Sequence, residues 1–85
     1  MTHETIINKG EKRYKFIIEA FMPEMWKELR HKYKFSLFYN DNSSLHWHSI
    51  ITSTDDPNSI LHHITEDEFF DAKLAMWELF FEKRP

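Results

Sequence analysis

The 85-residue chain contains no cysteine and a single glycine, Gly10. Without cysteine it can form neither a disulfide framework nor a thiolate zinc site. With one glycine, a phosphate-binding loop built from closely approaching backbone amides is not expected. The sequence also lacks a nucleophile motif and a paired-carboxylate pattern. We therefore predict a protein that is not an enzyme and that needs no cofactor.

The sequence has no long apolar run either. No stretch approaches the roughly 18 consecutive apolar residues of a membrane span, and residues 1–9 lack the apolar run of a signal peptide. We expect a cytoplasmic protein that has no membrane partner.

Aromatic residues are abundant, and charge is unevenly distributed. Eight Phe, three Trp and three Tyr exceed what a small core needs, so some rings should be exposed or covered by a partner. Residues 1–40 hold eight Lys/Arg and five Asp/Glu, whereas residues 41–85 hold three and nine. This asymmetry describes either two solvated faces of opposite sign or a basic phosphate-binding surface beside an acidic helix.

Residues 4–8 and 12–21 have the period-two pattern of a β-hairpin, with Gly10 in the turn. One side of the second strand would be apolar: Tyr14, Phe16, Ile18 and Ala20. The other side would be mixed: Arg13, Lys15, Ile17, Glu19 and Phe21. Residues 22–33 then repeat apolar side chains at helical spacing, which predicts a helix that ends near Tyr33.

A second hairpin is predicted from residues 35–40 and 45–53 around the turn-rich tetrad 41–44. With that loop, Phe38 would lie opposite Trp47, and Tyr39 would lie opposite His46.

The last helix is predicted over residues 65–83. Thr65 and Glu68 form a capping box, and Ile64 and Phe69 are spaced for a hydrophobic staple. The predicted apolar stripe consists of Phe70, Leu74, Trp77 and Phe81, and it is broadened by Phe69, Met76, Leu79 and Phe80. So broad an apolar surface predicts either deep burial or a second face that contacts another molecule.

Together these patterns predict a single α+β domain over residues 1–85 with the element order ββαββα. Two helices would cover one face of a four-stranded antiparallel sheet, and the other face would stay open.

His46 and His48 flank Trp47 and would point the same way from a strand. They could ligate a metal or, with Asp41, act in acid–base catalysis. Zinc needs three or four ligands, and nothing in the spacing supplies the rest, so we predict no metal site. We instead predict a strand that is buried or covered by a partner. The candidate partner-interface residues are Tyr39, His46, His48 and Phe80.

The basic residues of the N-terminal half are candidates for nucleic-acid binding: Lys12, Arg13, Lys15, Lys27, Arg30, Lys32 and Lys34. Aromatic residues lie between them: Tyr14, Phe16, Trp26 and Tyr33. Single-stranded nucleic acid is bound by cations that meet phosphates and by rings that stack on bases. The same rings are also good core candidates. We expect a non-catalytic protein that binds RNA or an RNA-associated protein.

An alternative is a protein-binding inhibitor or a homo-oligomeric adaptor, such as a homodimer, that uses an exposed aromatic face. In its length, lack of cysteine and aromatic content, the chain resembles the short accessory proteins of tailed phages, several of which block host defence enzymes or toxins. The resemblance rests on composition, so it carries no site residue. It implies an inhibitor that occupies a host protein target or an RNA-processing complex.

Overall fold

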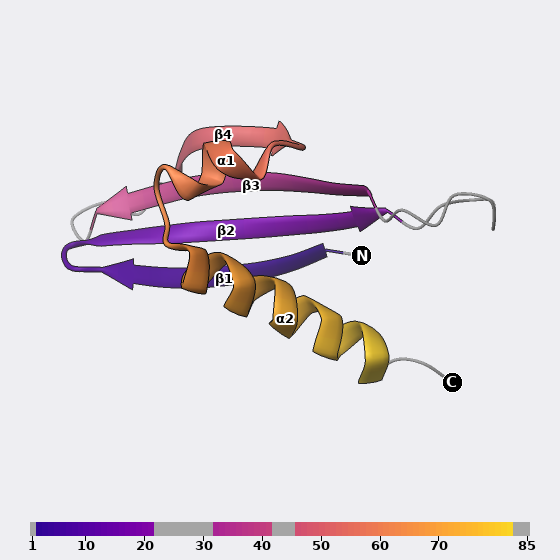
Figure 1. The fold of residues 1–85 in the computed structure, drawn as a ribbon. Coiled ribbons are helices and arrows are strands. Elements are labelled where there is room, and N and C mark those ends of the chain that lie inside the picture. Colours follow the sequence, from indigo (N-terminus) through magenta and orange to yellow (C-terminus); the bar gives the residue numbers. More distant parts are fainter. Residues whose placement is uncertain (1, 22–31, 42–45, 83–85) are drawn as a thin grey trace.

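The computed structural model describes residues 2–21, 32–41 and 46–82, with the side chains of 21, 32 and 80–82 excepted. Four strands precede two helices: β1 (Thr2–Lys9), β2 (Lys12–Phe21), β3 (Lys32–Asp41), β4 (His48–Thr54), α1 (Pro57–Leu61) and α2 (Glu66–Glu82). The strands form one antiparallel sheet in the order β1-β2-β3-β4 (Figure 1). The predicted α+β class and four-stranded antiparallel sheet are confirmed.

The order of the described elements is ββββαα, which differs from the predicted ββαββα. Most of the predicted first helix, residues 22–31, lies outside the described residues. Its predicted end near Tyr33 is wrong, because Lys32 and Tyr33 already belong to β3, where Tyr33 pairs with Ala20. Aromatic and β-branched side chains favour an extended backbone, and pairing with β2 adds hydrogen bonds that a helix end would lose.

The first hairpin closes through the two residues Gly10 and Glu11, because Lys9 pairs with Lys12. Gly10 has a φ of 61°, and Glu11 does not share this positive φ. A positive φ at the first loop residue alone is the pattern of a type II′ turn, which matches the twist of the flanking strands. The glycine is therefore required by the turn, as predicted.

The core lies on one face of the sheet. The predicted apolar side of β2 faces the helices: Phe16 and Ile18 are fully buried, and Tyr14 and Ala20 pack against them. Strand pairing places Leu37 and Phe35 of β3 beside these two buried residues. Figure 1 shows α1 and α2 on this same face of the sheet. The opposite face carries no helix among the described residues.

The capping box at the start of α2 is confirmed. The backbone N–H of Thr65 donates to Glu68 Oε1 at 2.8 Å, and the backbone N–H of Glu68 donates to Thr65 Oγ1 at 3.2 Å. Ile64 and Phe69 are both buried, as the hydrophobic staple requires. The Lys9 ammonium lies 2.9 Å from Glu68 Oε1 and so joins the end of β1 to the first turn of α2.

The predicted apolar stripe of α2 is wrong at Phe70 and Leu74, whereas Trp77 does pack against the core, and the side chain of Phe81 lies outside the described set. Phe70 and Leu74 are 61% and 58% exposed, whereas Phe69, Ala72 and Met76 are buried against the sheet. The staple at Phe69 fixes the rotation of the helix, and Phe70 is turned about 100° away from it. Spacing alone could not choose between two stripes of similar apolarity.

The second hairpin also differs from its predicted register. Tyr39 pairs with His48 and Phe38 with Ser49, not with His46 and Trp47. The strand begins at His48, so the connection is longer than the predicted tetrad, and the pairing is irregular around Leu37. A β-bulge of this kind shifts which residues face one another and cannot be read from alternation.

Candidate nucleic-acid interface

The open face of the sheet is built from the residues that alternate with the core. In β2 these include Arg13 and Lys15, because Phe16 and Ile18 point to the helices. Lys15 pairs with Ile6 of β1 and with Phe38 of β3. Ile6 is 45% exposed, so apolar surface is present on this face and is not buried by the described chain.

Two cations and two rings form a cluster on this face, which we call the open-face cluster: Arg13, Lys15, Phe38 and Trp47. The Lys15 ammonium lies 4.7 Å from the Trp47 ring centroid and 5.3 Å from that of Phe38. The Arg13 guanidinium carbon lies 5.7 Å from the Trp47 ring centroid. These distances are within the range of cation–π attraction. Lys15 therefore contacts two rings from different parts of the chain: Phe38 in β3, and Trp47 directly before β4.

The charge of the open face changes along the strands. Near the β1–β2 turn it holds Arg13 and Lys15, and within the described part of the chain no carboxylate lies within ion-pair distance of either. Toward the other end, Lys34 pairs across the strands with Glu19, and Glu4 pairs with Ile17. The basic half of the face is therefore the half that carries the two rings.

Two polar atoms beside the cluster are buried and have no hydrogen-bond partner among the described residues. They are Arg13 Nε and Asn40 Oδ1, and the two residues face each other across β2 and β3. Asn40 is only 1% exposed. A buried polar atom without a hydrogen-bond partner lowers stability by about 1–3 kcal/mol. A group that formed a hydrogen bond with either atom would therefore stabilise the protein.

Lys12 does not join this cluster, although it was predicted to share the nucleic-acid site. It alternates with Arg13, so it projects from the helix-bearing face, where its ammonium lies 6.0 Å from the Tyr39 ring. Tyr39 in turn contacts His48, with ring centroids 5.2 Å apart. Tyr39 is half-buried and His48 is exposed, so these two predicted interface residues lie together at the hairpin end of the helix-bearing face.

The remaining predicted site residues are separated from this cluster or are not described. Lys34 is on the open face but in its mixed half. His46 is exposed and precedes β4. Lys27 and Arg30 lie outside the described residues. Lys32 begins β3 and Phe80 belongs to α2, and the side chains of both lie outside the described set.

The two rings of the cluster, Phe38 and Trp47, were not among the predicted nucleic-acid-binding residues. Three of the rings named in the prediction belong to the core: Phe16 is fully buried, and Tyr14 and Tyr33 pack against it. The fourth, Trp26, lies outside the described residues. The signal that could have found Phe38 is strand parity. Phe38 lies opposite Lys15 in the sheet, and residues opposite each other on neighbouring strands share a face. Arg13 and Lys15 lie on that face because they alternate with the core residues of β2.

Comparison of the chain with protein-family models, curated protein sequences and solved structures gave no match. Neither helix in the described ranges is both long and apolar enough to cross a membrane. Across residues 2–21, 32–41 and 46–82, no three His, Asp or Glu side chains are grouped to hold a metal ion.

Proposed function

We propose that the protein binds single-stranded RNA through the open-face cluster and acts by occupying that RNA, without catalysis. The observation that carries the proposal is the position of Lys15, whose ammonium stands beside both Phe38 and Trp47. Cations next to half-exposed rings on an open sheet are what a single strand needs, because its phosphates seek charge and its bases seek flat apolar surface.

The energies favour an exchange of partners at the cluster. An exposed cation–π contact is worth about 0.5–1 kcal/mol, whereas stacking one base on an aromatic ring is worth about 1–3 kcal/mol. RNA that stacks on Trp47 and Phe38 therefore gains more than the protein loses when Lys15 turns from the rings to a phosphate.

The test compares two lysines of the same strand. Lys15→Gln and Lys12→Gln each remove one positive charge from β2, but the side chains project from opposite faces. Affinity for an RNA of about eight nucleotides would be measured by fluorescence anisotropy at several salt concentrations. Lys15→Gln should weaken binding and make the logarithmic salt slope shallower by about 0.7, which is the value for one lost phosphate contact on a single strand.

Lys12→Gln should leave both quantities close to those of the unaltered protein. Trp47→Leu should cost about 1–3 kcal/mol of binding energy through the loss of one stacking surface. Equal effects of the two lysine variants, or no RNA binding at low salt, would contradict the proposed site. DNA of the same sequence, measured in parallel, reports whether the ribose hydroxyls contribute.

A second candidate function is a protein-binding inhibitor or adaptor, and one observation favours it. Phe70 and Leu74 are exposed on one face of α2 and form an apolar stripe, of the kind that marks protein contacts. Phe70→Ser with Leu74→Ser should abolish a complex that survives nuclease treatment while leaving RNA affinity unchanged. The role against a host defence or toxin system, which the resemblance to phage accessory proteins implies, stays a prediction.

A further inference from the structure

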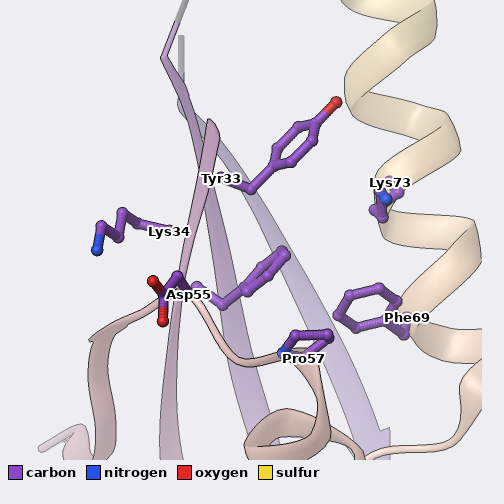
Figure 2. Close-up of a pocket in the computed structure, with 7 residues that line it drawn as sticks. Tyr33, Lys34, Asp55, Pro57, Phe69 and Lys73 are labelled. Carbon is purple, nitrogen blue, oxygen red and sulfur yellow. The ribbon is translucent and has the colours of Figure 1, made fainter. Parts of the chain in front are cut away.

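A cavity of about 630 Å³ opens on the helix-bearing face, between the start of β3, the start of α1 and the first half of α2 (Figure 2). Its apolar walls come from Tyr33, Phe35, Phe69 and Pro57. The volume falls within the range of pockets that hold small molecules. The cavity is on the opposite side of the sheet from the open-face cluster, so it is a separate site.

The aromatic walls are held in place by the fold. Phe35 and Phe69 are 4% and 5% exposed, and their ring centroids lie 5.3 Å apart. Tyr33 stacks on Phe35 at 6.3 Å with an interplanar angle of 12°, and its side chain is hydrogen-bonded to that of Trp77. Burial raises the pKa of Tyr33, and the hydrogen bond from Trp77 opposes this increase only in part. The phenol therefore stays neutral and does not repel an anion.

The charge on the ring side of the cavity is positive. The Lys73 ammonium lies 5.0 Å from the Tyr33 ring centroid and 5.9 Å from that of Phe69. In the described part of the chain, no carboxylate lies within ion-pair distance of Lys73. Lys34 and Asp55 also line the cavity, and Figure 2 shows their charged ends directed away from the aromatic rings. Of these three charged groups, Lys73 is the one that stands over the rings, so a ligand packed among the rings would meet its ammonium.

We propose that this cavity binds a small, flat, amphipathic anion, with an aromatic body and one carboxylate, sulfonate or phosphate group. The body would pack against Phe35, Phe69 and Tyr33, and the anionic group would approach the Lys73 ammonium. An aromatic ligand gains from the edges and faces of the wall rings. An anion gains a charge-assisted hydrogen bond from a lysine that forms no ion pair with any described carboxylate.

Two fluorescent probes that differ by one anionic group test the proposal. 8-Anilinonaphthalene-1-sulfonate carries a sulfonate, and N-phenyl-1-naphthylamine is the same body without it. We expect the sulfonate probe to bind once per chain and more tightly than the neutral probe. Lys73→Met should weaken the sulfonate probe roughly tenfold or more, because the charge-assisted contact is lost, and it should leave the affinity for the neutral probe nearly unchanged. Lys12→Met is the control, since it removes one charge elsewhere on the same sheet face.

The location is tested by amide chemical shifts of the unaltered protein, which do not depend on any variant folding. Titration with the sulfonate probe should shift the amides of Tyr33, Phe35, Phe69 and Lys73 most. Shifts centred on the exposed residues Phe70 and Leu74 would overturn the proposal, as would equal binding of both probes or an undiminished affinity in Lys73→Met. Absence of binding by the sulfonate probe would overturn it too.

Discussion

Replacing Phe69 and Phe70 one at a time tests the rotation of α2 about its own axis. The two rings are adjacent in sequence, yet Phe69 is 5% exposed and Phe70 is 61% exposed. Phe69 stacks on Phe16 at 5.5 Å and contacts Phe35 at 5.3 Å. Phe70 touches Phe69 only by an edge, at 6.0 Å. Truncation should therefore be costly at one position and mild at its neighbour.

The expected magnitudes differ severalfold. Phe69→Ala should cost about 3–5 kcal/mol, because it removes a buried ring and leaves a cavity. Phe70→Ala should cost at most about 1 kcal/mol, because it removes one edge contact at an exposed site. A domain of 85 residues has a free energy of unfolding of about 4–13 kcal/mol. Phe69→Ala could thus remove most of the free energy of unfolding. Phe69→Leu should lower it by only about 1–3 kcal/mol, so that this variant stays folded and can be compared with the Phe70 variant.

Urea unfolding followed by tryptophan fluorescence and circular dichroism gives the free energy of unfolding of each variant. The slope of that free energy with urea should stay constant, so that differences in midpoint report stability. A loss in the Phe70 variant equal to or larger than that in the Phe69 variants would refute the observed rotation of α2. It would restore the stripe through Phe70 and Leu74 as the core face.

Further substitutions probe the cap, the ion pair and the two residues of positive φ. Thr65→Ala should lower stability by about 1 kcal/mol in thermal melts, and Thr65→Ser should recover most of it. Burial alone would raise the pKa of Glu68, but the hydrogen bonds from Thr65 and the contact with Lys9 lower it below its ordinary value of 4.5. The folded protein therefore favours the charged form of Glu68, and this preference stabilises the fold at neutral pH. The stabilisation should be lost as pH falls through 4.5 and below. Glu68→Gln, which has no carboxylate at this position, should lose less stability over the same pH range. Gly10→Ala should cost about 1 kcal/mol because Gly10 has a φ of 61°, whereas Ser53→Gly should gain up to about 1 kcal/mol by relieving a φ of 48°. Unchanged melting temperatures in both the Gly10 and the Ser53 variant would contradict this account of the backbone.

The parts of the fold that the sequence predicted are those set by local chemistry. A single glycine between two alternating runs determined the first hairpin, and the residue at its first loop position has the positive φ expected of it. Thr65 and Glu68 bond each other's backbone through side chains three residues apart, so the cap needs no distant contact. The turn and the cap both depend on residues only a few positions apart, which is why they could be predicted from the sequence.

The features that were predicted wrongly depend on distant contacts. The second hairpin was placed by assuming a short loop, but β4 starts at His48 and its pairing is irregular near Leu37. The rotation of α2 was placed by spacing, but two stripes of similar apolarity competed, and packing of Phe69 on Phe16 and Phe35 decided between them. Pairing register and helix rotation are both fixed by tertiary packing, which overrides local pattern.

The sequence indicated a surface of cations and aromatic rings, but not which rings stand beside the cations. A basic segment with interleaved rings suggested a cation–aromatic surface, and Arg13 and Lys15 do stand beside rings on the open face. The rings are Phe38 and Trp47, which come from outside that segment, because neighbours within one strand alternate between faces. Contacts on one sheet face come from adjacent strands, so a site of this kind has to be sought across strands.

The charge asymmetry of the sequence separates the two proposed ligands. The first turn of α2 holds Glu66, Asp67 and Glu68, and this acidic helix packs on the face that bears the Lys73 cavity. A long polyanion that approached this face would meet those carboxylates as well as the lysines, whereas a small anion among the rings meets Lys73 at close range. Among the described residues, no carboxylate pairs with Arg13 or Lys15 in the basic half of the open face, so RNA that approaches there is attracted. Repulsion between charges in water is screened beyond about 8–10 Å at physiological salt, so the discrimination should be strongest at low salt. RNA should therefore fail to displace the sulfonate probe at low salt, even at concentrations that saturate the open face.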